Sequence, residues 1–136
     1  MDTTLHYLLM KDHLTFHKML SDSIKDTQLT PGQPKILDYL ASHNGAIQKD
    51  IASYCCIKQA TLTSVLAGME SKGLIERRSL NGNRRNLYVF LTDKGAELAA
   101  RVEQEFIKIE QTAFMGFQEK EKRQLVELLE RIKNNL

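Results

Sequence analysis

The chain has 136 residues with 42% hydrophobic and 26% charged side chains, which excludes a disordered protein and favours one soluble globular domain. The formal net charge of +2 identifies no partner, and Lys11, Asp12 and His13 keep the N-terminal apolar stretch too short for a signal peptide or membrane span. We therefore expect a cytoplasmic protein that does not contact membranes.

Two helices begin the chain. Apolar side chains at spacings of three, four and seven or eight predict a first amphipathic helix over residues 4–25. Pro34 then fits the first turn of a second helix, where its missing N–H costs nothing. This second helix is predicted to end near Asn44 and Gly45, because either residue can adopt the left-handed conformation of a C-terminal cap.

The next two helices form a helix-turn-helix pattern. A short helix over residues 48–54 precedes a longer one over residues 58–72. The longer helix carries apolar side chains at positions i, i+3, i+4 and i+7, which predicts one buried face. These side chains are Leu62, Val65, Leu66 and Met69. The other face holds small and polar residues, and we expect it to be exposed.

Two strands around a polar turn follow. Residues 74–80 and 86–92 have the pattern of strands, and Asn81-Gly82-Asn83 between them is a strong hairpin signal. A helix-turn-helix followed by a basic hairpin is a device for reading double-stranded DNA, with a helix for the major groove and a wing beside it. The pattern therefore predicts a DNA-binding core.

Two further amphipathic helices complete the predicted fold. Asp93 fits the N-cap of a helix that runs to about Phe114, where Met115 and Gly116 break it. The last helix covers residues 119–134. The apolar stripes of the first helix and these two exceed what a small winged core could cover, so we expect a symmetric homodimer. A monomer folded back on itself is the alternative.

The positive charge of the chain is concentrated in the predicted DNA-binding core. Residues 58–94 hold seven Lys or Arg against three Asp or Glu, whereas residues 1–57 and 95–136 each hold one acidic residue in excess. Attraction to phosphates requires such a local excess. The charge distribution thus favours the same segment as the helix and hairpin pattern.

With these elements in order, the chain resembles the MarR family of winged helix-turn-helix transcription regulators. The resemblance rests on the run from Thr61-Leu62-Thr63 to Gly73-Leu74-Ile75-Glu76-Arg77, and on Asn83-Arg84-Arg85 followed by Leu91-Thr92-Asp93-Lys94-Gly95. It implies a mainly α fold with a small β-hairpin wing. Its parts would be an N-terminal dimerisation helix over residues 1–30, a winged helix-turn-helix core over residues 31–94 and C-terminal dimerisation helices over residues 95–136, in one compact domain.

The chain departs from the family pattern at two positions. The family usually has Asp in the wing where this chain has Asn83, so the ion pair that would orient a wing arginine is weakened. The family also starts the recognition helix with a small hydroxyl residue, where this chain has Lys58 and thus lacks a favourable N-cap side chain.

By position, the resemblance implies a DNA-contacting set on the fourth helix and the hairpin. The set is Lys58, Gln59, Ala60, Thr61, Thr63, Ser64, Arg77, Arg84 and Arg85. Gln can bond an adenine edge in two places, Thr and Ser reach bases or phosphates, and arginines at a hairpin tip suit the minor groove. Thr61 leans toward the buried side, which leaves a place at the rim of the core open. Arg77 and Arg78 alternate along a strand, so at most one is expected to face DNA while the other pairs with Glu76 or Glu70.

The resemblance also implies an effector pocket between the winged core and the dimerisation helices, often for small aromatic or anionic compounds. Phe16, His17 and Met19 are the candidates to line it. His13 and His17 have the i, i+4 spacing of helical metal ligands, but no acidic or cysteine partner stands at ligand spacing. We therefore expect neither a metal nor another cofactor.

The favoured function is a homodimeric regulator, most often a repressor in this family, that binds a palindromic operator and is released by a small-molecule effector. One alternative is a winged module that contacts only proteins. Another is a thiol-based redox regulator using Cys55 and Cys56, although adjacent cysteines do not easily reach disulfide geometry and Cys55 occupies a predicted core position. Enzymatic activity is not expected, since no nucleophile elbow, phosphate loop or paired carboxylates occur.

Overall fold

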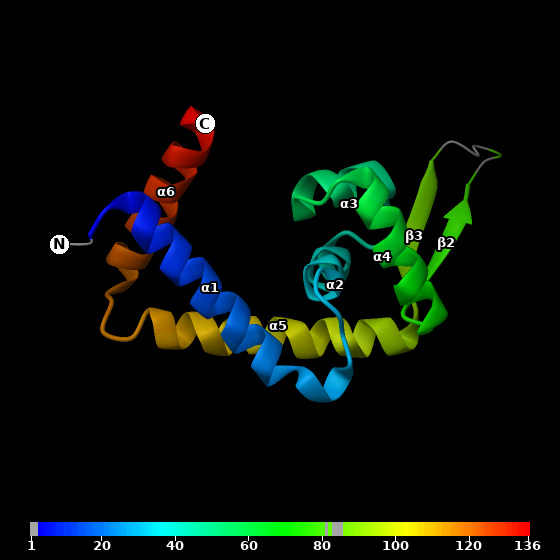
Figure 1. Cartoon of the computed structure of the whole chain (residues 1–136), viewed down its shortest axis with the longest axis horizontal. Helices are drawn as coiled ribbons and strands as arrows, with labels where there is room; N and C mark the ends of the chain where they lie inside the picture. The colour runs from blue at the N-terminus through cyan, green and yellow to red at the C-terminus, as the bar shows by residue number, and fades with distance from the viewer. Residues whose placement is uncertain (1–2, 81, 83–85) are drawn as a thin grey trace.

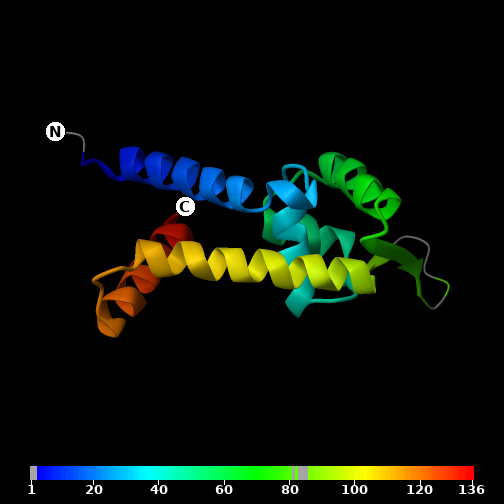
Figure 2. The same cartoon turned by 90° about the horizontal axis from the view of Figure 1, so that it is seen from below.

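The structure is a computed structural model that describes residues 3–80, 82 and 86–136. Figures 1 and 2 show a winged core at one end of the long helix α5, and both termini at the other end. In chain order the elements are α1 (Leu5–Ser23), a 3-10 helix η1 (Lys25–Thr27), α2 (Gln33–Ser42), β1 (Ala46–Ile47), α3 (Gln48–Cys55), α4 (Gln59–Ser71), β2 (Ile75–Ser79), β3 (Leu87–Leu91), α5 (Asp93–Ala113) and α6 (Glu119–Asn135). The predicted fold class, mainly α with a β wing, is confirmed.

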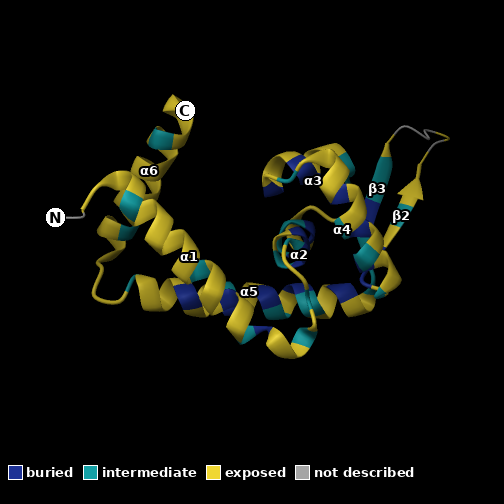
Figure 3. Cartoon of the chain, viewed as in Figure 1, coloured by how far each residue is buried: buried dark blue, intermediate teal, exposed yellow. Residues whose placement is uncertain are grey.

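The main core lies where α2, α3, α4 and the sheet pack on the first half of α5. Its largest side chains are less than 2% exposed, and they are Ile36, Leu37, Leu40, Ile51, Leu62, Leu66, Met69, Leu74, Ile75, Val89 and Val102. Three of the four apolar residues predicted for the buried face of α4 are in this set, while Val65 is half-buried. Figure 3 shows the buried residues gathered around α2 and along α5.

The sheet has three antiparallel strands in the order β1-β3-β2, whereas the sequence predicted only two. The missed strand, β1, pairs Ala46 with Val89 on β3. Two residues are too few to show the alternation by which a strand is identified in a sequence. The Asn44 side chain supports this edge by accepting a hydrogen bond from the Leu91 amide at 2.8 Å.

The start of α5 differs from the prediction by one residue. Thr92, not Asp93, is the N-cap, because its Oγ1 accepts a hydrogen bond from the Gly95 amide at 3.0 Å. The same hydroxyl donates to the carbonyl oxygen of Gly73 at 2.6 Å. Asp93 lies in the first turn instead, where a negative charge is favourable at a helix N-terminus. The N-cap thus also connects α5 to the end of α4.

The far ends of α1 and α6 leave many large apolar side chains exposed. A small second cluster, made of Leu20, Ile24 and Ile109 with Phe16 against it, joins α1 to α5. Beyond that cluster the exposed apolar residues are Leu5, Leu8, Leu9, Met10 and Leu14 on α1, and Leu125, Val126, Leu128 and Leu129 on α6. One copy of the chain therefore does not cover these stripes. None of the described helices has the length and apolar character needed to span a membrane.

Arg101 on α5 holds the end of α1 and the following turn. Its Nη1 and Nη2 contact the two carboxylate oxygens of Asp26 at 2.9 and 3.0 Å, and Nη2 also donates to the Ser23 carbonyl at 2.8 Å. Its Nε donates to the carboxylate of the buried Glu105 at 3.3 Å. Hydrogen bonds from Arg101 lower the pKa of Asp26. Burial opposes ionisation of Glu105, but Arg101 and Lys108 still hold its pKa below its usual value.

Replacing Arg101 with glutamine is expected to reduce thermal stability at neutral pH and much less in acid. Carboxylates whose pKa is lowered by folding stabilise the fold above their unfolded pKa of about 4, and the contribution is lost as the pH falls through that value and below. Melting temperatures at pH 7 and about pH 3 should therefore differ less in R101Q than in the wild type. R131Q on α6 is the control and should keep the wild-type difference. An unchanged difference in R101Q would contradict the assignment.

Candidate nucleic-acid interface

Helix α4 presents one polar face to solvent because its apolar face is buried in the core. Leu62, Leu66 and Met69 point inward and are fully buried. The residues predicted to contact the major groove are all exposed, and they are Lys58, Gln59, Ala60, Thr61, Thr63 and Ser64. Thr61 therefore does not lie at the rim of the core, which the sequence had left open. The Thr63 hydroxyl donates a hydrogen bond to the Gln59 carbonyl at 3.0 Å, so its proton is used within α4.

The turn between α3 and α4 is fixed by the backbone. Cys56 ends α3 in the left-handed conformation, with φ of 55°. The Ile57 amide donates to the Ala52 carbonyl at 3.0 Å. Lys58 is extended and serves as the N-cap of α4 without a side-chain hydrogen bond, as its residue type predicts. The α4 N-terminus thus leaves its amides available to a phosphate oxygen.

The other end of α4 is held by lysine side chains. The Lys72 ammonium donates to the Gln28 carbonyl at 2.8 Å and to Gln33 Oε1 at 3.1 Å. The Lys94 ammonium on α5 donates to the Lys72 carbonyl at 2.9 Å. These bonds connect the end of α4 to the segment before α2, to the first residue of α2 and to the start of α5, and they therefore fix the direction in which α4 points.

The arginines on β2 are both paired. Arg77 Nη2 lies 3.1 Å from Glu70 Oε1, its side chain is 19% exposed, and its hydrogen bond lowers the pKa of Glu70. Arg78 Nη2 lies 2.7 Å from Glu76 Oε2, and its guanidinium sits 4.6 Å from the centre of the Phe90 ring. The sequence predicted a pairing with Glu70 or Glu76 for one of the two arginines, and the structure shows it for both. Contact of Arg77 with DNA stays a prediction, and it would compete with Glu70.

The wing lies beside α4. Figure 1 shows β2 and β3 next to α4 at one end of the molecule, and residues of α4 and β2 are in contact. Arg84 and Arg85, together with Asn81 and Asn83 of the predicted turn, lie outside the described residues. Their proposed place at the DNA therefore rests on the sequence alone.

The three residues predicted to line an effector pocket lie on α1 and differ in burial. Phe16 packs into the cluster with Leu20, Ile24 and Ile109, which makes it a core residue. His17 and Met19 are exposed on α1. The rings of His13 and His17 are 6.3 Å apart, but no group of three potential metal ligands occurs among the described residues.

The two cysteines have different surroundings, and both are free thiols. Cys55 is buried, as predicted, and its thiol contacts the Lys35 carbonyl at 3.6 Å. Burial raises the pKa of the Cys55 thiol, which disfavours the reactive thiolate. Cys56 is exposed. Neither the core position of Cys55 nor its pKa favours a redox sensor.

In the folded protein, iodoacetamide is expected to alkylate Cys55 at least about tenfold more slowly than Cys56. The reason is that the thiolate fraction and the access of the reagent control the alkylation rate. Mass spectrometry of tryptic peptides, with C56S as the reference for Cys55 alone, measures the two rates. Unfolding in urea should remove the difference. Fast alkylation of Cys55 in folded C56S would contradict its protection and restore the thiol-sensor alternative.

Comparison with known proteins agrees with this geometry. Residues 29–87 match the sequence model of the MarR family. The homoprotocatechuate degradative operon repressor of Escherichia coli is 31% identical over 107 residues, which are 79% of this chain and 72% of that protein. The HTH-type transcriptional regulator PecS of Dickeya dadantii (strain 3937) is 36% identical over 86 residues, 63% of this chain. The match covers 52% of PecS, so this chain spans about half the length of that relative.

Solved structures extend the similarity to the whole chain. MepR of Staphylococcus aureus in its DNA-binding conformation superposes with a TM-score of 0.89 at 25% identity, covering 97% of this chain and 98% of MepR. A second structure of MepR, described as a regulator of the multidrug efflux pump MepA, gives a TM-score of 0.70 over the same shares of the two chains. The arrangement of helices in this chain is therefore nearer to that of the DNA-binding conformation.

Proposed function

Because the chain belongs to the MarR family of transcriptional regulators, we propose that it is a homodimeric repressor that binds a palindromic double-stranded DNA operator. The observation that carries the proposal is the orientation of α4. This helix buries Leu62, Leu66 and Met69 completely and leaves a polar face of Gln59, Thr61, Thr63 and Ser64 uncovered beside the wing. Such a face fits the major groove, where glutamine reads adenine and hydroxyl groups reach bases or phosphates.

The wing would supply most of the electrostatic attraction. Arg84 and Arg85 follow β2 in the segment with the local excess of positive charge. Guanidinium groups are attracted by the negative potential of a narrow minor groove. Since no arginine lies on α4, base edges would be read weakly there, and phosphate contacts would contribute a large share of the affinity.

The uncovered apolar residues of α1 and α6 support a dimer. They project from the end of α5 opposite the winged core, so a second copy could cover them while leaving α4 free (Figure 1). A two-fold axis through this end would place the two copies of α4 toward half-sites one helical turn of DNA apart. In this arrangement residues 1–30 and 95–136 form the dimerisation part and residues 31–94 the DNA-binding core.

Similarity to MepR in its DNA-binding conformation supports a chain folded in the arrangement that binds DNA. An effector would act by favouring a different spacing of the two α4 helices, through a difference in its affinity for the two arrangements. We assign no catalytic activity to the protein and place it in the cytoplasm, because the relatives named above are transcriptional regulators. A winged module for protein contacts alone remains the second candidate, favoured only by the pairing of Arg77 and Arg78 with glutamates.

Fluorescence anisotropy with DNA from upstream of its own gene, against scrambled duplex over a salt series, tests the function. Tight, sequence-selective binding at two subunits per site is the expected result. Four or five phosphate contacts per subunit would give a slope of log K against log salt of about −7 to −9 for the dimer. Unselective, salt-sensitive binding would mean that the protein binds DNA but that its operator does not lie upstream of its own gene. No binding at low salt would overturn the proposal and favour the protein-contact module.

A further inference from the structure

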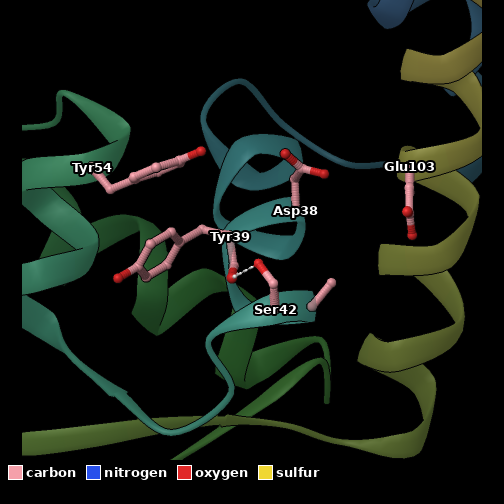
Figure 4. A pocket seen from close by; sticks show the side chains of 6 residues that line it. Asp38, Tyr39, Ser42, Tyr54 and Glu103 are labelled. Carbon is pink, nitrogen blue, oxygen red and sulfur yellow. Dashed lines mark hydrogen bonds between the residues drawn. The ribbon is translucent and has the colours of Figure 1, made fainter.

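A hollow of about 210 Å³ lies between the winged core and the long helix α5. Its walls are formed by Asp38, Tyr39, Ala41 and Ser42 of α2, Tyr54 of α3 and Glu103 of α5. Figure 4 shows the two tyrosine rings on one side, Asp38 between them and α5, and Glu103 facing α2 across the gap. The hollow thus joins three helices, one of which carries the proposed dimerisation part.

The hollow carries two carboxylates, and no basic residue lines it in the part of the chain that the structure describes. Asp38 is half-buried, and neither Asp38 nor Glu103 forms a hydrogen bond or ion pair with another described side chain. Burial raises the pKa of Asp38, and the negative charges of Glu103 and Glu110 on α5 raise it further. A bound cation would relieve this repulsion, whereas an anion would add to it.

Aromatic faces complete the lining. The Tyr39 and Tyr54 rings have centres 4.5 Å apart, and the His43 ring stacks on Tyr39 at 4.3 Å and lies 6.3 Å from Tyr54. Tyr54 is 65% exposed. A ligand that covered its ring would remove a large apolar area from water. In Figure 4 its hydroxyl end points toward Asp38. A tyrosine face beside carboxylates attracts a cation through the ring quadrupole as well as through charge.

We propose that this hollow binds a small organic cation with a flat aromatic part, whose ammonium or amidinium group lies between Asp38 and Glu103 and whose ring covers Tyr54. The volume of about 210 Å³ suits a ligand of roughly ten non-hydrogen atoms, at about 20 Å³ each in close packing. The family resemblance implied a small aromatic or anionic effector, and this ligand class is aromatic but cationic. The proposal rests on the proposed function only for its consequence, which is a change in DNA affinity.

The consequence follows from where the ligand sits. Asp38 and Tyr54 belong to α2 and α3 of the DNA-binding core, whereas Glu103 belongs to α5, whose first half packs on that core and whose second half leads to the dimerisation part. A cation held by all three would favour one position of the core relative to α5. DNA affinity changes if that position differs from the one that fits the operator.

Three ligands of nearly the same shape and different charge test the binding. Benzamidine is a cation, benzamide is neutral and benzoate is an anion, and each is titrated into the full chain by ¹H–¹⁵N NMR at pH 7. Benzamidine should shift the amides of Ser42, Tyr54 and Glu103 and bind at least about tenfold more tightly than the other two. Equal binding of benzamide or benzoate would overturn the cation site.

Two variants connect the affinity to the carboxylates. Asp38→Asn combined with Glu103→Gln should weaken benzamidine binding by about tenfold and bring it to the level of benzamide. Glu97→Gln lies on the same helix outside the hollow and should bind benzamidine like the wild type. If the double variant binds as tightly as the wild type, the proposed site is wrong.

Anisotropy with operator DNA, with and without saturating benzamidine, tests the consequence. A several-fold change in the DNA dissociation constant, absent in the D38N/E103Q variant, would support the ligand as an effector. Unchanged DNA affinity with benzamidine bound would overturn the effector role. A protein that binds benzamidine at this hollow but binds no DNA at any salt would retain the site and overturn the proposed function instead.

Discussion

Replacing Gly95 with alanine is expected to destabilise the protein by about 3 kcal/mol or more, the upper range for overpacking a core. Gly95 is buried in the first turn of α5, and an added Cβ would lie 1.9 Å from the Leu74 carbonyl oxygen. That oxygen cannot move away freely, because it accepts a hydrogen bond from the Thr92 amide at 3.0 Å. The methyl group would therefore separate α5 from the start of β2 or break this bond. Urea unfolding at fixed protein concentration measures the loss.

The same substitution at Gly68 is the matched control. Gly68 lies within α4, and a Cβ there would meet only Gln33 Nε2 at an ordinary contact distance of 3.6 Å. Because alanine favours a helix over glycine, G68A should be neutral or more stable by up to about 1 kcal/mol. Comparing G95A with G68A therefore distinguishes a steric clash at Gly95 from a general effect of replacing a helical glycine with alanine. A stability of G95A equal to that of the wild type would show that α5 does not approach Leu74 so closely.

Reversing both wing charges, Arg84→Glu with Arg85→Glu, is expected to lower DNA affinity by at least about 100-fold at moderate salt. The substitution changes the charge of each subunit by four units at the place where the wing is proposed to approach DNA. Each phosphate contact that is lost removes about 0.9 from the slope of log K against log salt, so the slope should become shallower by about 2 to 4 for a dimer. Fluorescence anisotropy over a salt series measures both quantities.

The control for this experiment changes the charge equally at the other end of the molecule. Lys120→Glu with Lys133→Glu affects two exposed residues of α6. A loss of affinity confined to the wing variant, with both proteins folded and of the same oligomeric state, places DNA at the wing. Equal losses in the two variants would reflect net charge alone. Wild-type affinity in R84E/R85E would exclude the wing from the interface.

Much of the fold was predictable because most of its elements have strong local signals. The bounds of α4 and α6 differ from the prediction by one residue at most, since a regular apolar periodicity marks both helices. These local signals fail where the role of a residue depends on contacts with residues in other parts of the fold. Thr92 caps α5 because it also reaches the Gly73 carbonyl, and Glu105 is buried, against the usual preference of its type, because Arg101 and Lys108 accompany it.

The candidate sites divide in the same way. The exposed face of α4 could be predicted, since it is the complement of a periodic apolar stripe. The hollow between Asp38, Tyr54 and Glu103 could not, because its residues come from three helices and share no spacing in the sequence. The effector residues taken from the family resemblance stay a prediction for a related reason. Phe16 has the same helical spacing whether it packs into a core or lines a cavity.

The length of α5 gives small movements in the dimerisation part a large effect at the DNA. This helix has 21 residues, so it extends over about 31 Å from the winged core to the turn before α6. If α5 pivots at its distal end by about 5°, geometry moves its other end by about 3 Å, close to the rise of one base pair. Near the middle of this helix Arg101 pairs with Asp26, which connects α5 to the segment that follows α1, and with Glu105 one turn further along α5. Repression would then depend less on the strength of any single base contact than on the angle between the α5 helices of the two subunits.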